Sequence, residues 1–218
     1  LVRNGVEVVI PKTQVCCGAL GWHAGAGEHA RKLARKNLKT FPEDVDAIVT
    51  NAAGCGSGLR EYPLMMKGLP EEGPAKRFAS KVVDLSEFLD KLGFEKPPSA
   101  KGCPRIVYQD ACHLRHAQGV VDAPRRLLRA ISGIELVEAA EPEICCGSAG
   151  SYNIDQPEIA ASLGKQKVGN LLDTKADWIV SGNIGCITQL RACLSSDEPL
   201  PPVTHLASLL RRAYEGKL

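Results

Sequence analysis

The sequence predicts an α/β protein made of two βα repeats, each with a short parallel sheet in a Rossmann-like layering. First, short apolar runs suited to buried parallel strands alternate with stretches of helical periodicity. Second, the chain repeats itself in order: VDAIVTNAAGC (45–55) matches ADWIVSGNIGC (176–186), and GVEVVIPKTQVCCG (5–18) matches GIELVEAAEPEICCG (133–147). The two halves are therefore expected to be related by a pseudo-twofold axis.

Five short apolar runs are predicted to form strands, because each is rich in β-branched residues and bounded by turn-forming residues. They are residues 6–10, 46–50, 105–109, 134–138 and 177–181.

Two long segments, residues 27–40 and 157–174, have the spacing of amphipathic helices. Pro157 suits the first turn of the second helix. The faces expected to be buried carry Ala30, Leu33, Ala34 and Leu38 in the first helix, and Ile159, Leu163 and Leu171 in the second.

The segment FEKPPSAKG (94–102) is predicted to link the repeats, so the first repeat spans residues 1–98 and the second residues 99–218. A third matching pair, 83–89 and 203–210, ends the two repeats in the same order. The first repeat lacks a counterpart of the strand at 105–109, so it is predicted to be truncated at its N-terminus.

The same comparison predicts a further cysteine upstream. Cys112 precedes Cys145 by 33 positions, and the same offset from Cys16 gives a position about 17 residues before Leu1. We expect the natural protein to carry a cysteine there, at the end of a strand.

Composition narrows the function classes. The chain has 218 residues, 44% of them hydrophobic, and a formal net charge of +2, which provides no strong field for collecting nucleic acid. The basic run 30–39 is expected to be a solvated helix face. No apolar stretch approaches the roughly 20 residues of a membrane-spanning helix, and no signal peptide is expected. A cytoplasmic protein is expected.

Nine cysteines are many for such a protein. Cys103 and Cys193 recur in neither repeat and are expected to be buried, reduced thiols. The other seven lie in the repeated motifs and are the predicted metal ligands: Cys112, Cys145, Cys146 and Cys186 in the second repeat, and Cys16, Cys17 and Cys55 in the first.

The ligand cysteines follow predicted parallel strands, whose carboxyl ends meet at one edge of a sheet. Four thiolates suit an iron–sulfur cluster or Zn²⁺. Structural zinc sites use Cys-x-x-Cys knuckles, which are absent here, and two adjacent thiolates reach different irons more readily than one small ion. A cluster is favoured, with zinc and a redox disulfide or metal-free site as alternatives. Metal binding is expected mainly in the second repeat, which holds four cysteines.

These motifs carry a family resemblance. Cys112, Cys145-Cys146-Gly147 and Cys186 resemble the CCG or cysteine-rich domain found in heterodisulfide reductase and in related iron–sulfur oxidoreductases. YQDACHL (108–114), PEICCGSAGSYNIDQPEIA (142–160) and SGNIGCITQLRA (181–192) look most like the bacterial glycolate oxidase iron–sulfur subunit.

The resemblance implies a subunit that relays electrons from a flavoprotein (FAD) partner oxidising glycolate toward a respiratory acceptor. It implies a 4Fe–4S type cluster, no catalytic residue in this chain, and association with the inner face of the membrane only through the complex. Related subunits that serve lactate or glycerol 3-phosphate oxidation also resemble the chain. An assembly module stapled by zinc, or free of metal, is the alternative class.

Several polar residues can have either an ordinary structural role or a functional one. The histidines near the cysteines, His23, His113 and His116, can serve as ligands or proton carriers, but polar capping or surface placement explains them better. Asp110 can cap or fix the Cys112 loop. Tyr152 and Asn153 can line the site, but core packing and turn formation explain them equally well. His205 occupies the place of Asp84 and is expected to help start a helix.

Overall fold

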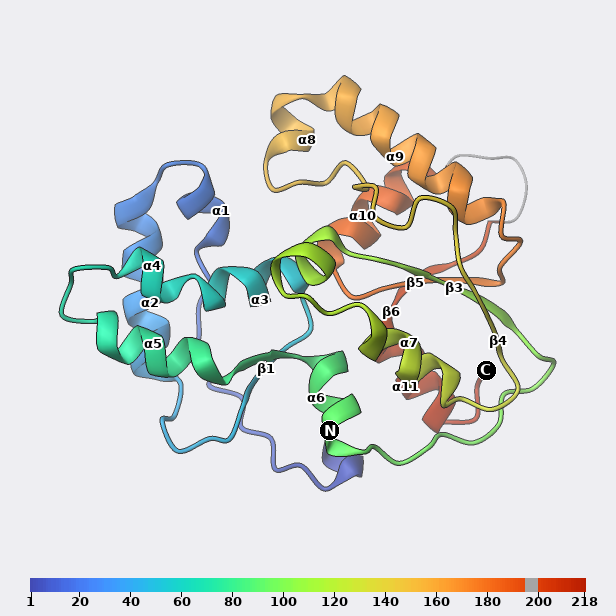
Figure 1. The fold of residues 1–218 in the computed structure, drawn as a ribbon, viewed down its shortest axis with the longest axis horizontal. Helices are drawn as coiled ribbons and strands as arrows, with labels where there is room; N and C mark the ends of the chain where they lie inside the picture. Colours follow the sequence, from blue (N-terminus) through green and yellow to red (C-terminus); the bar gives the residue numbers. More distant parts are fainter. Residues whose placement is uncertain (195–199) are drawn as a thin grey trace.

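The computed structural model describes residues 1–194 and 200–218 and is an α/β fold in which every described strand pair is parallel. Helices of the first repeat lie at the left of Figure 1, and the four-stranded sheet lies at the right. The elements of the first repeat are η1 (Val2–Asn4), α1 (Ala19–His23), α2 (Gly27–Thr40), β1 (Ile48–Thr50), α3 (Ala53–Arg60), α4 (Tyr62–Met65), α5 (Glu72–Lys81), β2 (Val82–Asp84) and α6 (Leu85–Leu92).

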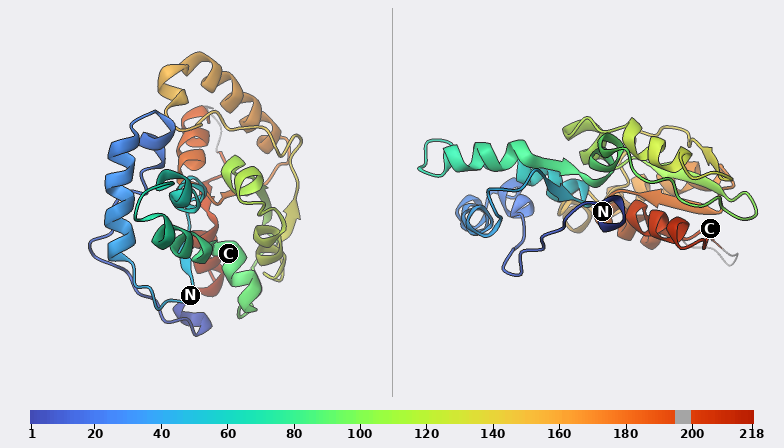
Figure 2. Two further views of the ribbon diagram at one scale, coloured as in Figure 1. Left: turned by 60° about the vertical axis from the view of Figure 1, so that its left-hand side comes forward. Right: turned by 90° about the horizontal axis from the view of Figure 1, so that it is seen from below.

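The second repeat begins with two further strands and then follows the order of the first, but among its described residues no helices correspond to α4 and α5. The right-hand view of Figure 2 shows its sheet on the opposite side of the molecule from α2 and α5. Its elements are β3 (Arg105–Gln109), η2 (His113–Ala117), α7 (Asp122–Arg129), β4 (Glu135–Val137), α8 (Tyr152–Asp155), α9 (Pro157–Leu172), β5 (Trp178–Ser181), α10 (Ile184–Cys193), β6 (Val203–His205) and α11 (Leu206–Tyr214).

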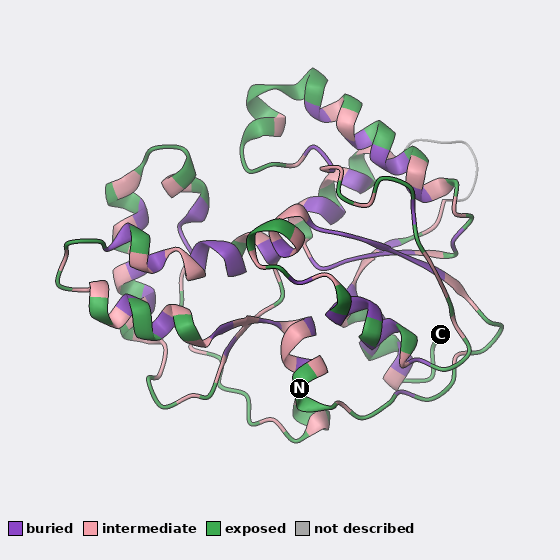
Figure 3. Cartoon of the chain, viewed as in Figure 1, coloured by how far each residue is buried: buried purple, intermediate pink, exposed green. Residues whose placement is uncertain are grey.

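The sheet of the second repeat has the order β4-β3-β5-β6 and is the centre of three layers. Because side chains alternate along a strand, its two faces join different cores. Val107 and Ile179 pack with α9 and α10, whereas Ile106 and Val180 pack with α7, α11 and Leu89 of α6. Figure 3 shows the resulting buried stretch along β3 and β5. The first repeat has only the pair β1-β2.

The strand predicted at residues 6–10 is wrong: this segment is extended coil, and Val9 and Ile10 are exposed. Its counterpart β4 pairs only with β3. Within residues 1–194 and 200–218 the first repeat has no counterpart of β3, so residues 6–10 have no strand to pair with. The other four predicted strands are confirmed within one or two residues at each end. The short strands β2 and β6 were not predicted.

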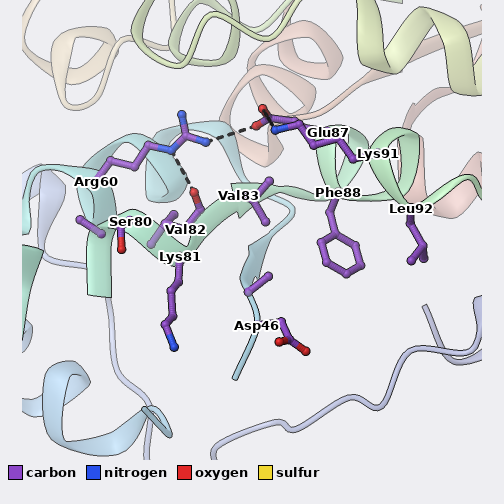
Figure 4. A pocket seen from close by; sticks show the side chains of 12 residues that line it. Asp46, Arg60, Ser80, Lys81, Val82, Val83, Glu87, Phe88, Lys91 and Leu92 are labelled. Carbon is purple, nitrogen blue, oxygen red and sulfur yellow. Dashed lines mark hydrogen bonds and ion pairs between the residues drawn. The ribbon is translucent and has the colours of Figure 1, made fainter. Parts of the chain in front are cut away.

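Equivalent contacts recur in the two repeats. The Arg60 guanidinium donates to the Val82 carbonyl at 3.2 Å (Figure 4), and Arg191 donates to the Val203 carbonyl at 2.6 Å. Asp84 and His205 each accept from the backbone two residues on and cap α6 and α11, as the sequence predicts. The repeated sequence therefore encodes repeated tertiary contacts.

The helix predictions are confirmed in position, and one buried face needs correction. α2 buries Ala30 and Ala34. In α9 Leu171 is buried, but Ile159 is half exposed, and Lys167 is buried instead. In the part of the chain that the structure describes, no helix is long and apolar enough to cross a membrane.

Candidate metal centre

Four cysteines of the second repeat come together at the carboxyl edge of its sheet. Cys112 follows β3, Cys145 and Cys146 lie in the loop after β4, and Cys186 lies in the first turn of α10 after β5. Their thiols lie close enough to shift one another's pKa, Cys112 with Cys145, Cys145 with Cys146, and Cys146 with Cys186. Three loops distant in sequence therefore deliver four sulfurs to one place.

The pKa values of the four thiols are shifted in opposite directions. Hydrogen bonds from Cys112 and Cys146 hold the pKa of Cys145 well below that of a free thiol. The bond to Cys145 and burial raise the pKa of Cys112, and bonds to Cys145 and Cys186 raise that of Cys146. The pKa of Cys186 is lowered, first by Cys146. Cys145 and Cys186 are therefore the members of the set that lose a proton most readily, and the thiolate is the form that binds metal.

The first repeat brings Cys16, Cys17 and Cys55 together in the same way. The hydrogen bond between Cys17 and Cys55 raises the pKa of Cys17 and lowers that of Cys55 to about 7, and Cys16 also bonds to Cys17. Cys16 and Cys55 are exposed, whereas Cys146 and Cys186 are buried. This set has three sulfurs and is more open to solvent.

Glycine after each cysteine pair lets the loop approach the following helix. Gly147 has a φ of 87°, and a Cβ there would collide with the Ala160 backbone of α9. Gly18 has a φ of 84°, and its Cβ would lie 3.2 Å from the Ala30 carbonyl oxygen of α2. The amides of Gly147 and Gly18 donate to Cys145 Sγ and Cys16 Sγ, both at 3.4 Å. The glycines are needed to hold the sulfurs over the helix.

An ion pair lies behind Cys112. Asp110, at the end of β3, is buried and accepts two hydrogen bonds from Arg125 of α7. Arg125 also donates to both carboxylate oxygens of Glu138. Asp110 therefore fixes the Cys112 loop, as one interpretation of the sequence expects.

The polar residues near the cysteines have different surroundings. His113 Nδ1 lies 3.5 Å from Cys112 Sγ, whereas His116 is exposed. His23 pairs with Glu61 at 2.8 Å. Tyr152 and Asn153 lie on α8, where Tyr152 is at the surface. Of these residues, His113 is the one that touches a cysteine of the set.

The two cysteines outside the motifs are separate from both sets. Cys193 is half-buried at the end of α10, and its thiol packs against Gly164 of α9. Cys103 is exposed in the segment before β3, so the expectation that it is buried is wrong. That expectation rested on the usual burial of free cysteines, but Cys103 has a φ of 53° in a surface turn.

The two sets are joined through Asn183. The Asn183 amide donates to Cys186 Sγ at 3.3 Å and accepts from the Gly54 amide, one residue before Cys55, at 3.4 Å. The Ala53 amide also donates to the Gly182 carbonyl at 3.3 Å. Sequence analysis missed Asn183; its place before Gly-Cys at the start of the repeated helix was the available signal.

The chemistry of the donor set fits an iron–sulfur cluster. Across residues 1–194 and 200–218, no three His, Cys, Asp or Glu side chains are grouped so as to hold one metal ion. Thiolate sulfur is the ligand that iron–sulfur clusters use, and four cysteines are the usual number for one cluster. A hollow of about 730 Å³ lies elsewhere, at the amino end of β1, where Asp46, Lys81 and Phe88 line it and no cysteine does (Figure 4).

Comparisons with known proteins agree with this chemistry. The cysteine-rich domain family, CCG, matches residues 1–60 and 106–191. The probable glycolate oxidase iron-sulfur subunit of Bacillus subtilis (strain 168) is 39% identical over 98% of this chain and 49% of its own length. Lactate utilization protein A of Oceanobacillus iheyensis is 34% identical over 99% of this chain and 88% of its own length. The chain spans about half the length of the Bacillus subtilis relative.

Proposed function

Because the chain belongs to the cysteine-rich CCG domain family, we propose that it carries electrons in an oxidoreductase complex, as the iron–sulfur part of a glycolate oxidase. The observation that carries this proposal is the convergence of Cys112, Cys145, Cys146 and Cys186 at one sheet edge. The relatives named for glycolate and for lactate both point to a short 2-hydroxy acid as the substrate of the partner. A lactate-oxidising complex is the second candidate, since the lactate relative matches over most of its length.

The proposed partners are a flavoprotein (FAD) subunit that oxidises the acid and a respiratory acceptor downstream. The proposed location of the complex is the cytoplasm, with peripheral association at the inner face of the membrane. A 4Fe–4S cluster, when bound, supplies reversible one-electron chemistry. Cys112, Cys145, Cys146 and Cys186 would hold it, and Cys16, Cys17 and Cys55 form a second, more open set.

The protein around the second set prepares it for this role. Gly147 presents Cys145 and Cys146 over α9, and the Asp110–Arg125 pair fixes the loop that carries Cys112. The burial of Cys146 and Cys186 excludes water from one side of the sulfurs. Such burial and the hydrogen bonds to sulfur are what set the potential of a cluster.

Anaerobic reconstitution of the chain with iron and sulfide, followed by metal and sulfide analysis and EPR, tests the proposal. We expect a bound, reducible centre. Zinc in place of iron, or a chain that binds neither, would support the assembly module instead. Adding the oxidised flavoprotein partner with glycolate or lactate then identifies the electron source, because only the acid that the partner oxidises supplies electrons to the centre.

A further inference from the structure

The two cysteine sets differ in the side chain that supports the loop before them. Seven residues after the alanine that contacts the motif glycine, α2 carries Asn37 and α9 carries Lys167. Both are 1% exposed. The Asn37 amide donates to the carbonyls of Val15 and Cys16. The same position therefore holds a neutral amide in the first repeat and an amine in the second.

The amine of Lys167 is held by backbone carbonyl oxygens. Its Nζ donates to the carbonyls of Glu141 and Pro142 at 3.0 and 2.9 Å. Burial lowers the pKa of Lys167, and the nearby charges of Asp110 and Glu143 oppose that effect. The ion pair of Asp110 is with Arg125, and Lys167 is held by backbone carbonyls.

Lys167 acts on the sulfurs of the second set. One turn before Lys167, a Cβ on Gly164 would lie 3.3 Å from the Cys146 carbonyl oxygen, and Val168 packs in one buried cluster with Cys146 and Cys186. The positive charge of Lys167 is among the causes that lower the pKa of Cys186, after Cys146 and Asn183. A positive charge in a buried site is screened less than one at the surface. The first set has no such cation in this position.

A second difference lies at the start of the helix that carries the last cysteine. The residue before α10 is Asn183, and the equivalent residue before α3 is Ala52. Asn183 makes no cap bond to its own helix and instead donates to Cys186 Sγ. Alanine has no donor, so Cys55 lacks this hydrogen bond.

We propose that Lys167 and Asn183 are positioning residues that stabilise negative charge on the second cysteine set, so that an electron settles there in preference to the first set. The inference rests on the proposed electron-carrying role. One added electron makes the site more negative by one charge, which a nearby cation and a sulfur-directed N–H both favour. The asymmetry between the repeats would then give the electron path a direction.

The reconstituted full chain tests this in a potentiometric titration with dithionite as the one-electron reductant. Lys167→Gln is expected to lower the reduced-to-oxidised ratio at a fixed potential about tenfold, a shift of about 59 mV for one electron. Lys165→Gln, which removes an exposed lysine of the same helix, is the matched control and should leave the ratio unchanged. Equal ratios for the two variants would overturn the role of Lys167.

Asn183 has its own pair of variants. Asn183→Ala removes the donor, and Asn183→Asp keeps the shape and the acceptor for Gly54 while placing a negative charge at Cys186. The ratio is expected to fall about threefold in the first and further in the second. A purely structural role predicts the reverse order, since Asn183→Asp preserves more contacts.

A measurement without any cluster separates this inference from the proposed function. In the reduced, metal-free chain at about pH 8, ultraviolet thiolate absorbance should fall in Lys167→Gln and Asn183→Ala but not in Lys165→Gln. The effect of Asn183→Ala should vanish in a Cys186→Ser background. If no cluster assembles, the proposed function fails and the thiolate signal alone decides the inference; an unchanged signal contradicts it.

Discussion

Asp110, two residues before Cys112, forms an ion pair with Arg125 through two hydrogen bonds, with nitrogen–oxygen distances of 2.9 and 2.7 Å. The side chains of both are almost fully buried, whereas Glu138, which shares Arg125, is nearly half exposed. The pair joins the end of β3 to α7, so the loop that carries Cys112 is anchored by charge as well as by packing.

Breaking this pair should be costly. Asp110→Asn removes the negative charge opposite Arg125 and one of its two acceptor oxygens, and we expect the free energy of unfolding to fall by about 1.5–3 kcal/mol. Chemical denaturation measures this. Glu138→Gln is the control, because its exposed carboxylate should contribute no more than about 1 kcal/mol. Equal losses from the two variants would show that the inner bonds have no special weight.

The motif glycines should be unequal in their tolerance of a side chain. Gly147→Ala places a Cβ against the Ala160 backbone at a positive φ, and we expect a loss of about 2–4 kcal/mol. Gly18→Ala, with its 3.2 Å contact, should cost about 1–2 kcal/mol. Thermal unfolding compares both with Gly169→Ala, which meets nothing within 4 Å on α9 and should be neutral or stabilising. A Gly147→Ala variant as stable as Gly169→Ala would disprove the close approach.

His205 should stabilise the fold through two hydrogen bonds, one on each ring nitrogen. Its Nδ1 accepts from the Ala207 amide at 3.0 Å, and its Nε2 donates to the Asn51 carbonyl of the first repeat at 2.6 Å. His205→Ala should cost about 1–2 kcal/mol in thermal unfolding. His205→Asp restores the cap that Asp84 provides in the other repeat and should recover part of that loss. No recovery would mean that the cap contributes little.

Much of the fold was predictable because the signals were local or repeated. The runs at 105–109 and 177–181 are apolar enough to be recognised as buried strands. The match between the repeats placed Cys55 and Cys186 in equivalent positions. Parallel strands then place their following loops at one edge. The arrangement of the second cysteine set follows from these facts alone.

The sequence-based predictions fail where contacts with distant parts of the chain determine the local structure or the burial of a residue. Residues 6–10 have the composition of a strand but lack a strand to pair with, and β2 and β6 are three residues long, too short for a periodic signal. Lys167 was not predicted to be buried because lysine rarely is. Its burial is possible because the backbone carbonyls of Glu141 and Pro142 accept hydrogen bonds from its amine.

The central claim is that the second cysteine set holds a metal centre, and iron and sulfide content across a Cys→Ser series tests it most directly. Substituting any one of Cys112, Cys145, Cys146 and Cys186 should lose the centre, because a serine oxygen is a poor ligand for iron. Melting temperature should fall with it, since metal binding is coupled to folding. Cys103→Ser and Cys193→Ser should keep the full iron and sulfide content. If all six variants retain equal iron and sulfide, the four cysteines are not ligands and the duplicated motif is structural.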